Sequence, residues 1–560
     1  MFEDHCHYTE DLADNDIQYK DVVIVGNGPS SICLSYMLAG NWPYYTGEPH
    51  PGDEMLTARL ANGTSSGLAC NTRWGLETLS LGLEGRNGGR PLPLLIDHLQ
   101  HPCTDAGLDL PPLLTWIPPG TESGGEDHEV FDHVVLGKGA PGGAWQAMDP
   151  NVLTISLSRW MSLPGLDIKT WESMVEAEQR EVHDHSLTST GTGDQIPNPF
   201  LTQEKLSSYK GLGRVLVGTV AKYFRDYVRI QKLEKYFRCG TTVTSVRPVN
   251  NQKDGDAEND TSEYKWIVQG VENDSGKRFE YRAKRVVLAT GASDHSNRLG
   301  LPGEDSNSNW LTHDLNDLET KLDCIAMQQC RDRLADPVLI IGAGLSAADA
   351  VTAARFRGIP VLHAFRHNNN NTEYWSNNNV KREKGVGKNG ISVGSDRLRW
   401  LPPSMYPEYH KVYEMMADGG TNYPLYQALS NYTLVDLYPN SNCSSNGKKL
   451  VTLCSPNGEL RSFEVSVVAI LIGSRPDLSF LQESGLGLGK DPSKPIDGRS
   501  NPILVDDFTY EVNRAPAKGL YALGPLAGDN FVRFTQGGAF GVLTHILNTT
   551  CNVTHRAKKK

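Results

Sequence analysis

The sequence predicts an α/β protein with two Rossmann-like parallel sheets, each built around a glycine turn, with one domain inserted in the other. Three observations predict this class: five strand-like runs end abruptly in glycine, one is followed by a complete glycine fingerprint, and the first is followed by an incomplete one. β-branched runs with few polar positions are typical of parallel strands buried on both faces, and a strand ending in glycine before a helix begins a βα unit. The runs are DVVIVGNG (21–28), RVVLATGAS (285–293), PVLIIGAG (337–344), VVAILIGSRPD (467–477) and GLYALGPLAGD (519–529).

The first run leads into an incomplete dinucleotide fingerprint. Gly26 and Gly28 occupy the first two glycine positions, but Ser31 occupies the third. Pro29 suits the first turn of the following helix, where its missing N–H costs little, and Ser30 is a further candidate contact. No acid follows a clear second strand, so the adenosine-ribose contacts of this site stay open.

The second fingerprint is complete. Gly342 allows the sharp turn, Gly344 lets the backbone approach a pyrophosphate, and the small Ala347 lets the helix pack close to the strand. The first helical amides, including that of Ser346, would face the phosphates. Arg366 replaces the usual ribose-binding acid after the next strand, which favours NADP over NAD, although a surface arginine closing a strand is the alternative.

Two such turns in one chain indicate a flavoprotein with FAD in one domain and a nicotinamide nucleotide in the other. A glycine-dense loop ending in tryptophan could lie against a flat ring, and an Asp before a glycine-rich helix start could accept hydrogen bonds from ribityl hydroxyls. That helix start would offer amides to the flavin's pyrimidine edge. The further candidate FAD contacts are Gly142, Gly143, Trp145, Val243, Thr290, Gly291, Gly528, Asp529, Gln536 and Gly537.

The expected domain organisation follows from these turns. The first part of an FAD-binding domain occupies 17–300 and contains a long insertion at 41–134, and the second part occupies 476–550. An NADP-binding domain with an Asn-rich loop at 367–397 occupies 301–475, and a basic tail occupies 551–560.

The composition excludes several classes of protein. With 560 residues and 38% hydrophobic content, the chain is long enough for several cores at about 150 residues per domain. The net charge of -12 is opposite to the basic surface that neutralises nucleic-acid phosphates. The longest apolar run, 465–473, is about half a membrane span, and no secretory signal pattern opens the chain. We expect a cytoplasmic protein without a transmembrane segment, with association with mitochondria as an alternative.

Several longer strings occur along the chain: PGGAW (141–145), YFRDYV (223–228), DPVLIIGAGLSAADAV (336–351), MYPEYHKVYEMM (405–416), LIGSRPDLSFL (471–481) and GPLAGDNFVRFTQGGA (524–539). Together they resemble the oxidative stress-induced growth inhibitor family, and the resemblance covers nearly the whole chain, from Tyr19 to about Leu547. That family is similar to the flavin-containing and Baeyer-Villiger monooxygenases, in which FAD and NADPH activate molecular oxygen. The resemblance implies an FAD domain interrupted by an NADP domain, and a link to growth, differentiation or cell death under oxidative stress.

Two positions depart from the monooxygenase pattern. The linker signature keeps Leu301-Pro-Gly and His313 but lacks its Phe and Gly, and Asn151 only approximately matches the asparagine that lies over the flavin. Asn151 is nevertheless the candidate catalytic residue.

The expected function is that of an FAD- and NADPH-dependent monooxygenase-like oxidoreductase acting on a small molecule and molecular oxygen. The alternatives are a nucleotide-binding regulator that acts through protein partners and an NADPH oxidase that produces hydrogen peroxide. The ten cysteines form no Cys-x-x-Cys pair and no zinc-like cluster, which disfavours a disulfide reductase and predicts no metal site.

Overall fold

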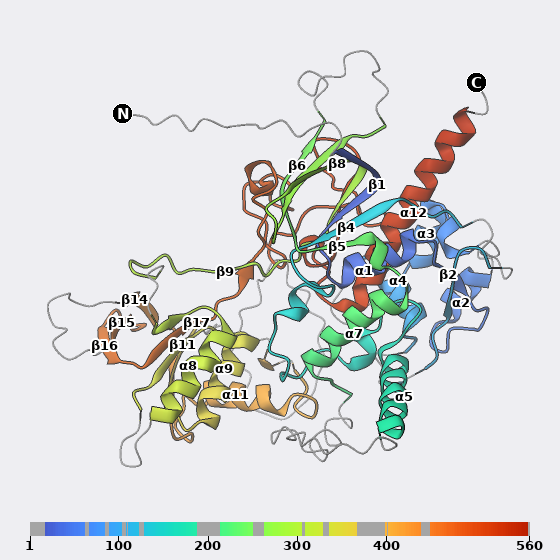
Figure 1. Cartoon of the computed structure of the whole chain (residues 1–560). Helices are drawn as coiled ribbons and strands as arrows, with labels where there is room; N and C mark the ends of the chain where they lie inside the picture. Colours follow the sequence, from blue (N-terminus) through green and yellow to red (C-terminus); the bar gives the residue numbers. More distant parts are fainter. Residues whose placement is uncertain are drawn as a thin grey trace, which may run out of the picture. The chain divides into compact units, whose positions relative to one another are not determined.

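The computed structural model describes residues 17–61, 67–84, 89–103, 108, 110–121, 128–186, 213–249, 263–304, 309–328, 335–366, 398–399, 401–437 and 449–557. The chain divides into two compact units, the first formed by 1–292 with 476–560 and the second by 293–475. The second unit is thus inserted in the sequence of the first, and both are α/β (Figure 1). This confirms the predicted fold class. The Asn-rich segment 367–397 lies outside the described residues.

The first unit is built on a seven-stranded sheet in the order β5-β4-β1-β8-β7-β6, with β19 also paired to β8. β4, β1, β8 and β19 are parallel, so their carboxyl ends meet at one edge, as in other nucleotide-binding sheets. The strands are β1 (Ile17–Val25), β4 (His133–Gly137), β5 (Phe237–Cys239), β6 (Thr241–Pro248), β7 (Trp266–Glu272), β8 (Arg278–Leu288) and β19 (Leu520–Ala522).

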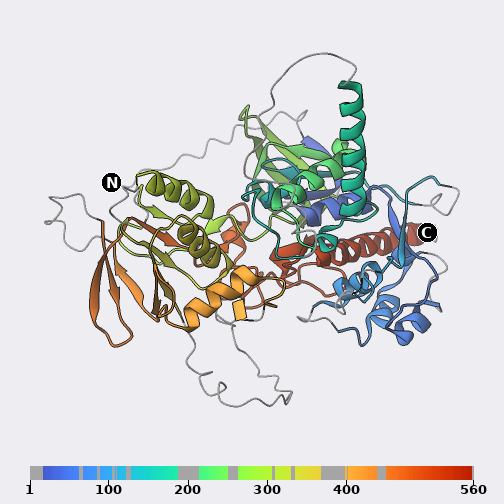
Figure 2. The ribbon, with the colours of Figure 1, turned by 90° about the horizontal axis from the view of Figure 1, so that it is seen from below.

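Helix α1 (Pro29–Leu38) is buried on every side because it is covered by the sheet and by α12 (Val532–Ala557). Pro29 occupies its first turn, where no N–H is needed. Figure 2 shows α12 as the long red helix, which continues through most of the segment expected as a basic tail. The other helices of this unit are α2 (Glu54–Ala61), η2 (Leu68–Cys70), α3 (Arg73–Ser80), α4 (Pro91–Gln100), η4 (Gly143–Gln146), η5 (Ser158–Met161), α5 (Ile168–Ser186), α7 (Val217–Ile230), η6 (Glu234–Tyr236), η8 (Gln482–Gly485) and η9 (Gly524–Ala527).

The long insertion separates α1 from β4, the strand that completes the first βαβ unit. Its strands β2 (Trp42–Tyr45) and β3 (Leu114–Ile117) pair antiparallel with each other in a separate two-stranded sheet. Its helix α4 packs along α12, so the insertion forms part of the first unit's core.

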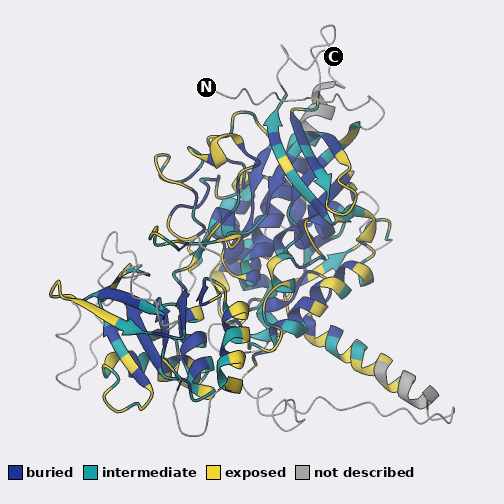
Figure 3. Cartoon of the chain, turned by 60° about the vertical axis from the view of Figure 1, so that its left-hand side comes forward, coloured by how far each residue is buried: buried dark blue, intermediate teal, exposed yellow. Residues whose placement is uncertain are grey.

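The second unit has a five-stranded parallel sheet in the order β10-β17-β11-β12-β13. In Figure 3 the inner strands of both units are dark blue, which marks them as buried. The sheet's strands are β10 (Leu311–Thr312), β11 (Val338–Ile341), β12 (Val361–Phe365), β13 (Tyr426–Ser430) and β17 (Val467–Ile470). The remaining elements are β9 (His295–Ser296), α8 (Leu315–Gln328), α9 (Leu345–Phe356), α11 (Pro407–Ala417), β14 (Thr433–Asp436), β15 (Leu450–Cys454), β16 (Leu460–Glu464) and β18 (Ser474–Arg475).

Candidate functional site

The first glycine turn lies between β1 and α1. Gly26 has a φ of 105°, and a Cβ there would overlap the carbonyl oxygen of Ala289 at the end of β8, so only glycine fits. A Cβ on Gly28 would meet no atom within 4 Å. The turn therefore presents open backbone at the N-terminus of α1, where helix amides favour an anion such as a pyrophosphate. Pro29 and Ser30 follow in the first helical turn.

The glycine-dense loop packs directly on this turn. The N–H of Gly142 donates to the carbonyl oxygen of Asn27 over 2.9 Å, and a Cβ on Gly143 would lie 3.1 Å from the Cα of Gly28. Trp145 is half-buried with its ring edge-on to Phe224, the centroids being 5.8 Å apart. The structure thus brings the two predicted glycine segments together, and we call the surface formed by Gly26–Gly28 and Gly142–Gly143 the glycine cradle.

The end of β8 and the start of η9 complete this cradle. The side-chain oxygen of Thr290 is buried and has no hydrogen-bond partner in the protein, while Gly291 has a φ of 83° and open space at its Cβ position. A Cβ on Gly524 would lie 2.5 Å from Oγ of Ser30. Because a buried hydroxyl without a partner is costly, the Thr290 hydroxyl is a group that a polar ligand at this edge could satisfy.

The missing ribose acid has a structural explanation. The strand beside β1 is β4, which begins after the insertion and ends at Gly137 without an acid. The space beside Gly137 is filled by the side chain of Asn27, whose Nδ2 donates to the carbonyl oxygen of Gly139 over 2.7 Å. Lys138, which is exposed, follows the strand.

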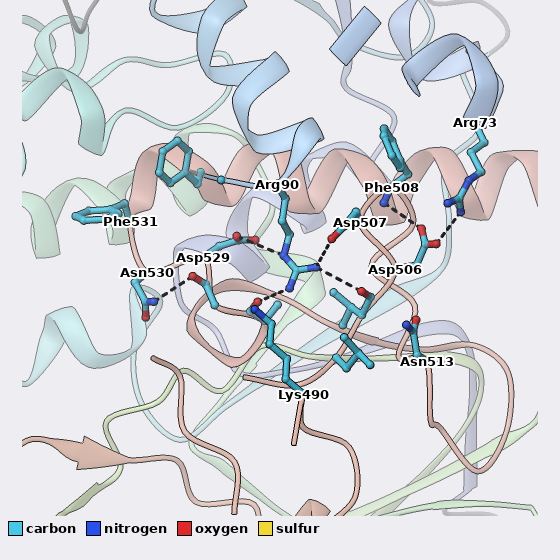
Figure 4. A pocket seen from close by; sticks show the side chains of 16 residues that line it. Arg73, Arg90, Lys490, Asp506, Asp507, Phe508, Asn513, Asp529, Asn530 and Phe531 are labelled. Carbon is cyan, nitrogen blue, oxygen red and sulfur yellow. Dashed lines mark hydrogen bonds and ion pairs between the residues drawn. The ribbon is translucent and has the colours of Figure 1, made fainter. Parts of the chain in front are cut away.

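Gly528 and Asp529 line a cavity of about 760 Å³ at the end of η9 (Figure 4). Since η9 starts on the cradle at Gly524 and ends at this cavity, one short segment links the two features. Gly528 caps η9 with a φ of 95°. The charged lining residues are Arg73, Arg90, Lys490, Asp506, Asp507 and Asp529, and the aromatic ones are Phe508, Phe531 and Phe534.

The carboxylate of Asp529 is 8% exposed and already has partners. Its Oδ2 accepts a hydrogen bond from the Tyr510 hydroxyl over 2.7 Å, and its Oδ1 lies 3.8 Å from Nε of Arg90. Burial raises the pKa of Asp529 to about 6, against the opposing effects of the Arg90 charge and the Tyr510 hydrogen bond.

Two predicted flavin contacts on α12 lie against other protein segments. Nε2 of Gln536 donates to the carbonyl oxygen of Ser162 over 3.0 Å, while its Oε1 is buried without a partner. A Cβ on Gly537 would overlap the backbone of Pro93, so this glycine allows α12 and α4 to approach closely. The contact of Gly537 with α4 accounts for this glycine without a ligand.

Asn151 and Val243 lie on other segments of the first unit. Asn151 is exposed in the turn after η4, and its N–H donates to Oδ1 of Asp149 over 2.9 Å. Val243 lies in β6, opposite Gly270 and next to a register shift between Val243 and Ser245. The described contacts do not join either residue to the glycine cradle.

The second unit repeats the design of the first turn. Gly342 has a φ of 145°, and a Cβ there would overlap the carbonyl oxygen of Leu471 at the end of β17. A Cβ on Gly344 would again meet no atom within 4 Å. Ala347 is fully buried, and its Cβ would lie 3.3 Å from a Cβ on Gly342, so a larger residue would push α9 away from β11. Ser346 is exposed in the first turn of α9.

Two residues near the second glycine turn come from β12: His363 lies within the strand and Arg366 follows its end. Arg366 is exposed directly after β12, at the same sheet edge as the glycine turn. His363 is fully buried within the strand, where its Nε2 lies 2.7 Å from the carbonyl oxygen of Gly342. Burial lowers the pKa of His363 to about 4, so the ring is neutral.

The sequence interpretation missed Arg90, Tyr510 and His363. A histidine inside the buried run VLHAF was a usable signal, because a polar side chain within a two-sided buried strand needs partners. Arg90 carried no such signal, because it lies in an insertion without a recognisable motif.

Three further observations concern metal ligands, membrane spans and cysteines among the described residues. Their histidines, cysteines and acids include no group that could hold a metal ion. None of the described helices is long and apolar enough to cross a membrane. Cys33, Cys70, Cys103, Cys239, Cys324 and Cys454 are all free thiols.

Two glycine turns of the same design, each at the carboxyl edge of a parallel sheet, define a two-domain dinucleotide-binding protein of the FAD and NAD(P) type. Residues 215–368 match the model of the pyridine nucleotide-disulphide oxidoreductase family. Oxidative stress-induced growth inhibitor 2 of Homo sapiens is 35% identical over 98% of this chain and 96% of its own length. Growth inhibitor 1 of Mus musculus is 37% identical over 94% and 95%. The chain belongs to the oxidative stress-induced growth inhibitor family.

Among solved structures, the bacillithiol disulfide reductase from Bacillus cereus matches 95% of this chain and 100% of its own, with 16% identity and a TM-score of 0.48.

Proposed function

We propose that the chain is an NADPH-dependent flavoprotein oxidoreductase of the monooxygenase type. The observation that carries the assignment of two nucleotide cofactors is the repetition of one turn: a glycine pressed against the neighbouring strand, followed by a glycine open to approach. The monooxygenase type follows from the family resemblance. Gly26 and Gly28 form it in the first unit, and Gly342 and Gly344 form it in the second. Two dinucleotide sites in one chain would serve the electron transfer from NADPH to FAD that such a flavoprotein requires. Bound FAD and NADPH would supply that electron-transfer chemistry.

The residues of the first unit fit FAD. The open face of Gly28 and the amides of α1 would hold the pyrophosphate, and the backbone of Gly142 and Gly143 would lie beside the bound molecule. The orphaned hydroxyl of Thr290 would gain a hydrogen-bond partner. The sheet edge and the C-terminal segment would keep water away from the reacting part.

The residues of the second unit fit NADPH. Gly344 and the first amides of α9, including Ser346, would hold the pyrophosphate. Arg366 would pair with the 2′-phosphate, because its guanidinium presents several donors to phosphate oxygens and it stands directly after β12, where an NAD-binding domain would have an acid.

The names of the relatives add a physiological context. Because both mammalian relatives are named oxidative stress-induced growth inhibitors, we extend that role to this chain as a redox protein that restrains growth. Molecular oxygen and an unidentified small molecule are the proposed co-substrates, and hydrogen peroxide would be the product if oxygen were reduced without an acceptor.

The experiment compares two variants of the full chain, Gly28→Val and Gly344→Val. The native protein should carry FAD, seen as flavin absorbance, and NADPH should bleach that absorbance without oxygen. Gly28→Val should lose the flavin but still bind NADPH. Gly344→Val should keep the flavin but resist reduction by NADPH. A native protein that stays colourless after addition of FAD would contradict the proposal, and so would normal bleaching in Gly344→Val.

A further inference from the structure

Arg90 extends from the insertion into the cavity next to Asp529 (Figure 4). Its side chain is only 12% exposed. One terminal nitrogen donates to the carbonyl oxygen of Ala527 over 2.6 Å, and the other lies 3.1 Å from Oδ1 of Asp507. Its Nε lies 3.8 Å from Oδ1 of Asp529. A terminal nitrogen also donates to the carbonyl oxygen of Val505 over 3.5 Å. A single guanidinium therefore contacts four residues between positions 505 and 529.

The carboxylate of Asp529 lies between Arg90 and Tyr510. The Tyr510 hydroxyl donates to Oδ2, and the Arg90 guanidinium lies over the Tyr510 ring, 5.3 Å from its centroid. Asp507 and Lys490 are the other charged groups that influence Asp529. Arg90 and Lys490 favour the ionised form and Asp507 opposes it, so Arg90 offsets part of the cost of burying this carboxylate.

Helix α4 has a second attachment that does not involve Arg90. At its other end, Nε of Arg533 lies 3.1 Å from each carboxylate oxygen of Asp97, which is buried, and the Arg533 side chain is only 10% exposed. Gly537 also lets α12 approach Pro93 closely. The docking of α4 is therefore anchored by Asp97 as well, and the effect of Arg90 on Asp529 can be tested separately.

We propose that Arg90 is a positioning residue of the flavin site, which holds the Gly524–Asp529 segment in place and keeps the Asp529 carboxylate ionised for the bound cofactor. The proposal rests on the proposed function. It gives the insertion between α1 and β4 a chemical role, because the insertion supplies Arg90, the cation that lies beside the carboxylate of Asp529.

The test measures FAD affinity of the full-length apo protein by fluorescence titration as a function of pH, from about 5 to 8. The variants are Arg90→Gln, Arg90→Lys, Asp529→Asn and the double variant Arg90→Gln/Asp529→Asn. Arg73→Gln is the matched control, because Arg73 also lies in the insertion and lines the cavity but pairs with Asp506. Asp97→Asn controls for loosening of α4.

We expect Arg90→Gln to weaken FAD binding roughly tenfold or more, because removing one partner of a buried charge pair leaves the other uncompensated. As the pH is lowered, the FAD affinity of Arg90→Gln should begin to fall at a higher pH than that of the native protein, because Asp529 becomes protonated earlier without the Arg90 charge. Arg90→Lys should restore part of the affinity. In the Asp529→Asn background, Arg90→Gln should have a clearly smaller effect than in the native background, because only its contacts with Ala527 and Asp507 remain to be lost. Arg73→Gln should match the native protein.

Equal losses from Arg90→Gln in both backgrounds would overturn the proposal, as would an unchanged pH profile. If Arg90→Gln does not fold, Tyr510→Phe replaces it, because it removes the hydrogen bond that also favours ionised Asp529 and should shift the profile in the same direction. A native protein that binds no FAD overturns the proposed function and this inference together. A native protein that binds FAD, with Arg90→Gln of equal affinity, overturns the inference alone.

Discussion

His363 supports the second glycine turn from beneath: its Nε2 lies 2.7 Å from the carbonyl oxygen of Gly342. A carbonyl oxygen can only accept, so Nε2 carries the proton and Nδ1 accepts from the Tyr426 hydroxyl over 2.9 Å. The ring is therefore held in one tautomer, with both nitrogens used, directly below the residue that makes the turn. The conformation of the turn at Gly342 should therefore depend on the hydrogen bond from His363.

We expect His363→Leu to lower the free energy of unfolding by about 1–3 kcal/mol, because it leaves a buried carbonyl and a buried hydroxyl without partners. It should also weaken NADPH binding while leaving flavin content unchanged. Thermal unfolding and NADPH titration measure the two effects. Tyr426→Phe, which removes only the donor to Nδ1, is the milder control. Unchanged NADPH affinity in His363→Leu would remove His363 from the nucleotide site.

The pKa values of two buried histidines predict loss of stability in acid. Burial lowers the pKa of both His363 and His133 to about 4, against an ordinary value of 6.5. Between these values the unfolded chain binds protons that the folded chain does not, so stability falls as pH falls from about 6.5 to 4. Each histidine accounts for roughly 3 kcal/mol over that range. Urea unfolding against pH measures the slope, which should be shallower in His363→Leu; an equal slope would exclude His363 as a cause.

Ser31 occupies the third fingerprint position and is fully buried with no hydrogen-bond partner for its hydroxyl. Ser31→Ala should therefore stabilise the protein by about 1 kcal/mol, since it removes an unsatisfied polar group. Ser35 on the same helix is the control, because its equally buried hydroxyl lies 2.8 Å from Nε2 of His133 and Ser35→Ala should destabilise. Thermal unfolding of the two variants measures both effects. Equal losses of stability in Ser31→Ala and Ser35→Ala would refute the conclusion that the Ser31 hydroxyl has no hydrogen-bond partner.

Arg366 should determine the choice between NADPH and NADH. We expect Arg366→Ala to reduce the ratio of affinities about tenfold or more by removing a charge-assisted bond to the 2′-phosphate. Titrations with both nucleotides measure the ratio. Arg461→Ala, which removes a surface arginine paired with Glu459, should leave the ratio unchanged. An unchanged ratio in Arg366→Ala would make Arg366 an ordinary surface residue.

The fold class and both turns could be predicted because their causes are local. A strand that must turn sharply against its neighbour needs glycine at one position, and Gly26 and Gly342 have the positive φ and the close strand contact that this requires. The third position tolerated Ser31 in one unit and Ala347 in the other, since both are small.

The second strand of the first unit could not be placed from the sequence. A dinucleotide fingerprint predicts an acid at the end of a strand soon after α1, but β4 pairs with β1 only after an insertion of about ninety residues. Which strand lies beside β1 is a long-range pairing that no local pattern encodes.

The sequence by itself determined two βα turns on parallel strands and the family, because glycine spacing and buried β-branched runs are properties of short segments. Only the tertiary structure decided that Arg90 meets Asp529, that Gly537 serves the contact with Pro93, and that His363 supports Gly342. The first two pairs join residues more than four hundred positions apart. Their contacts exist because α4 docks on α12, and that docking depends on the packing of the whole first unit.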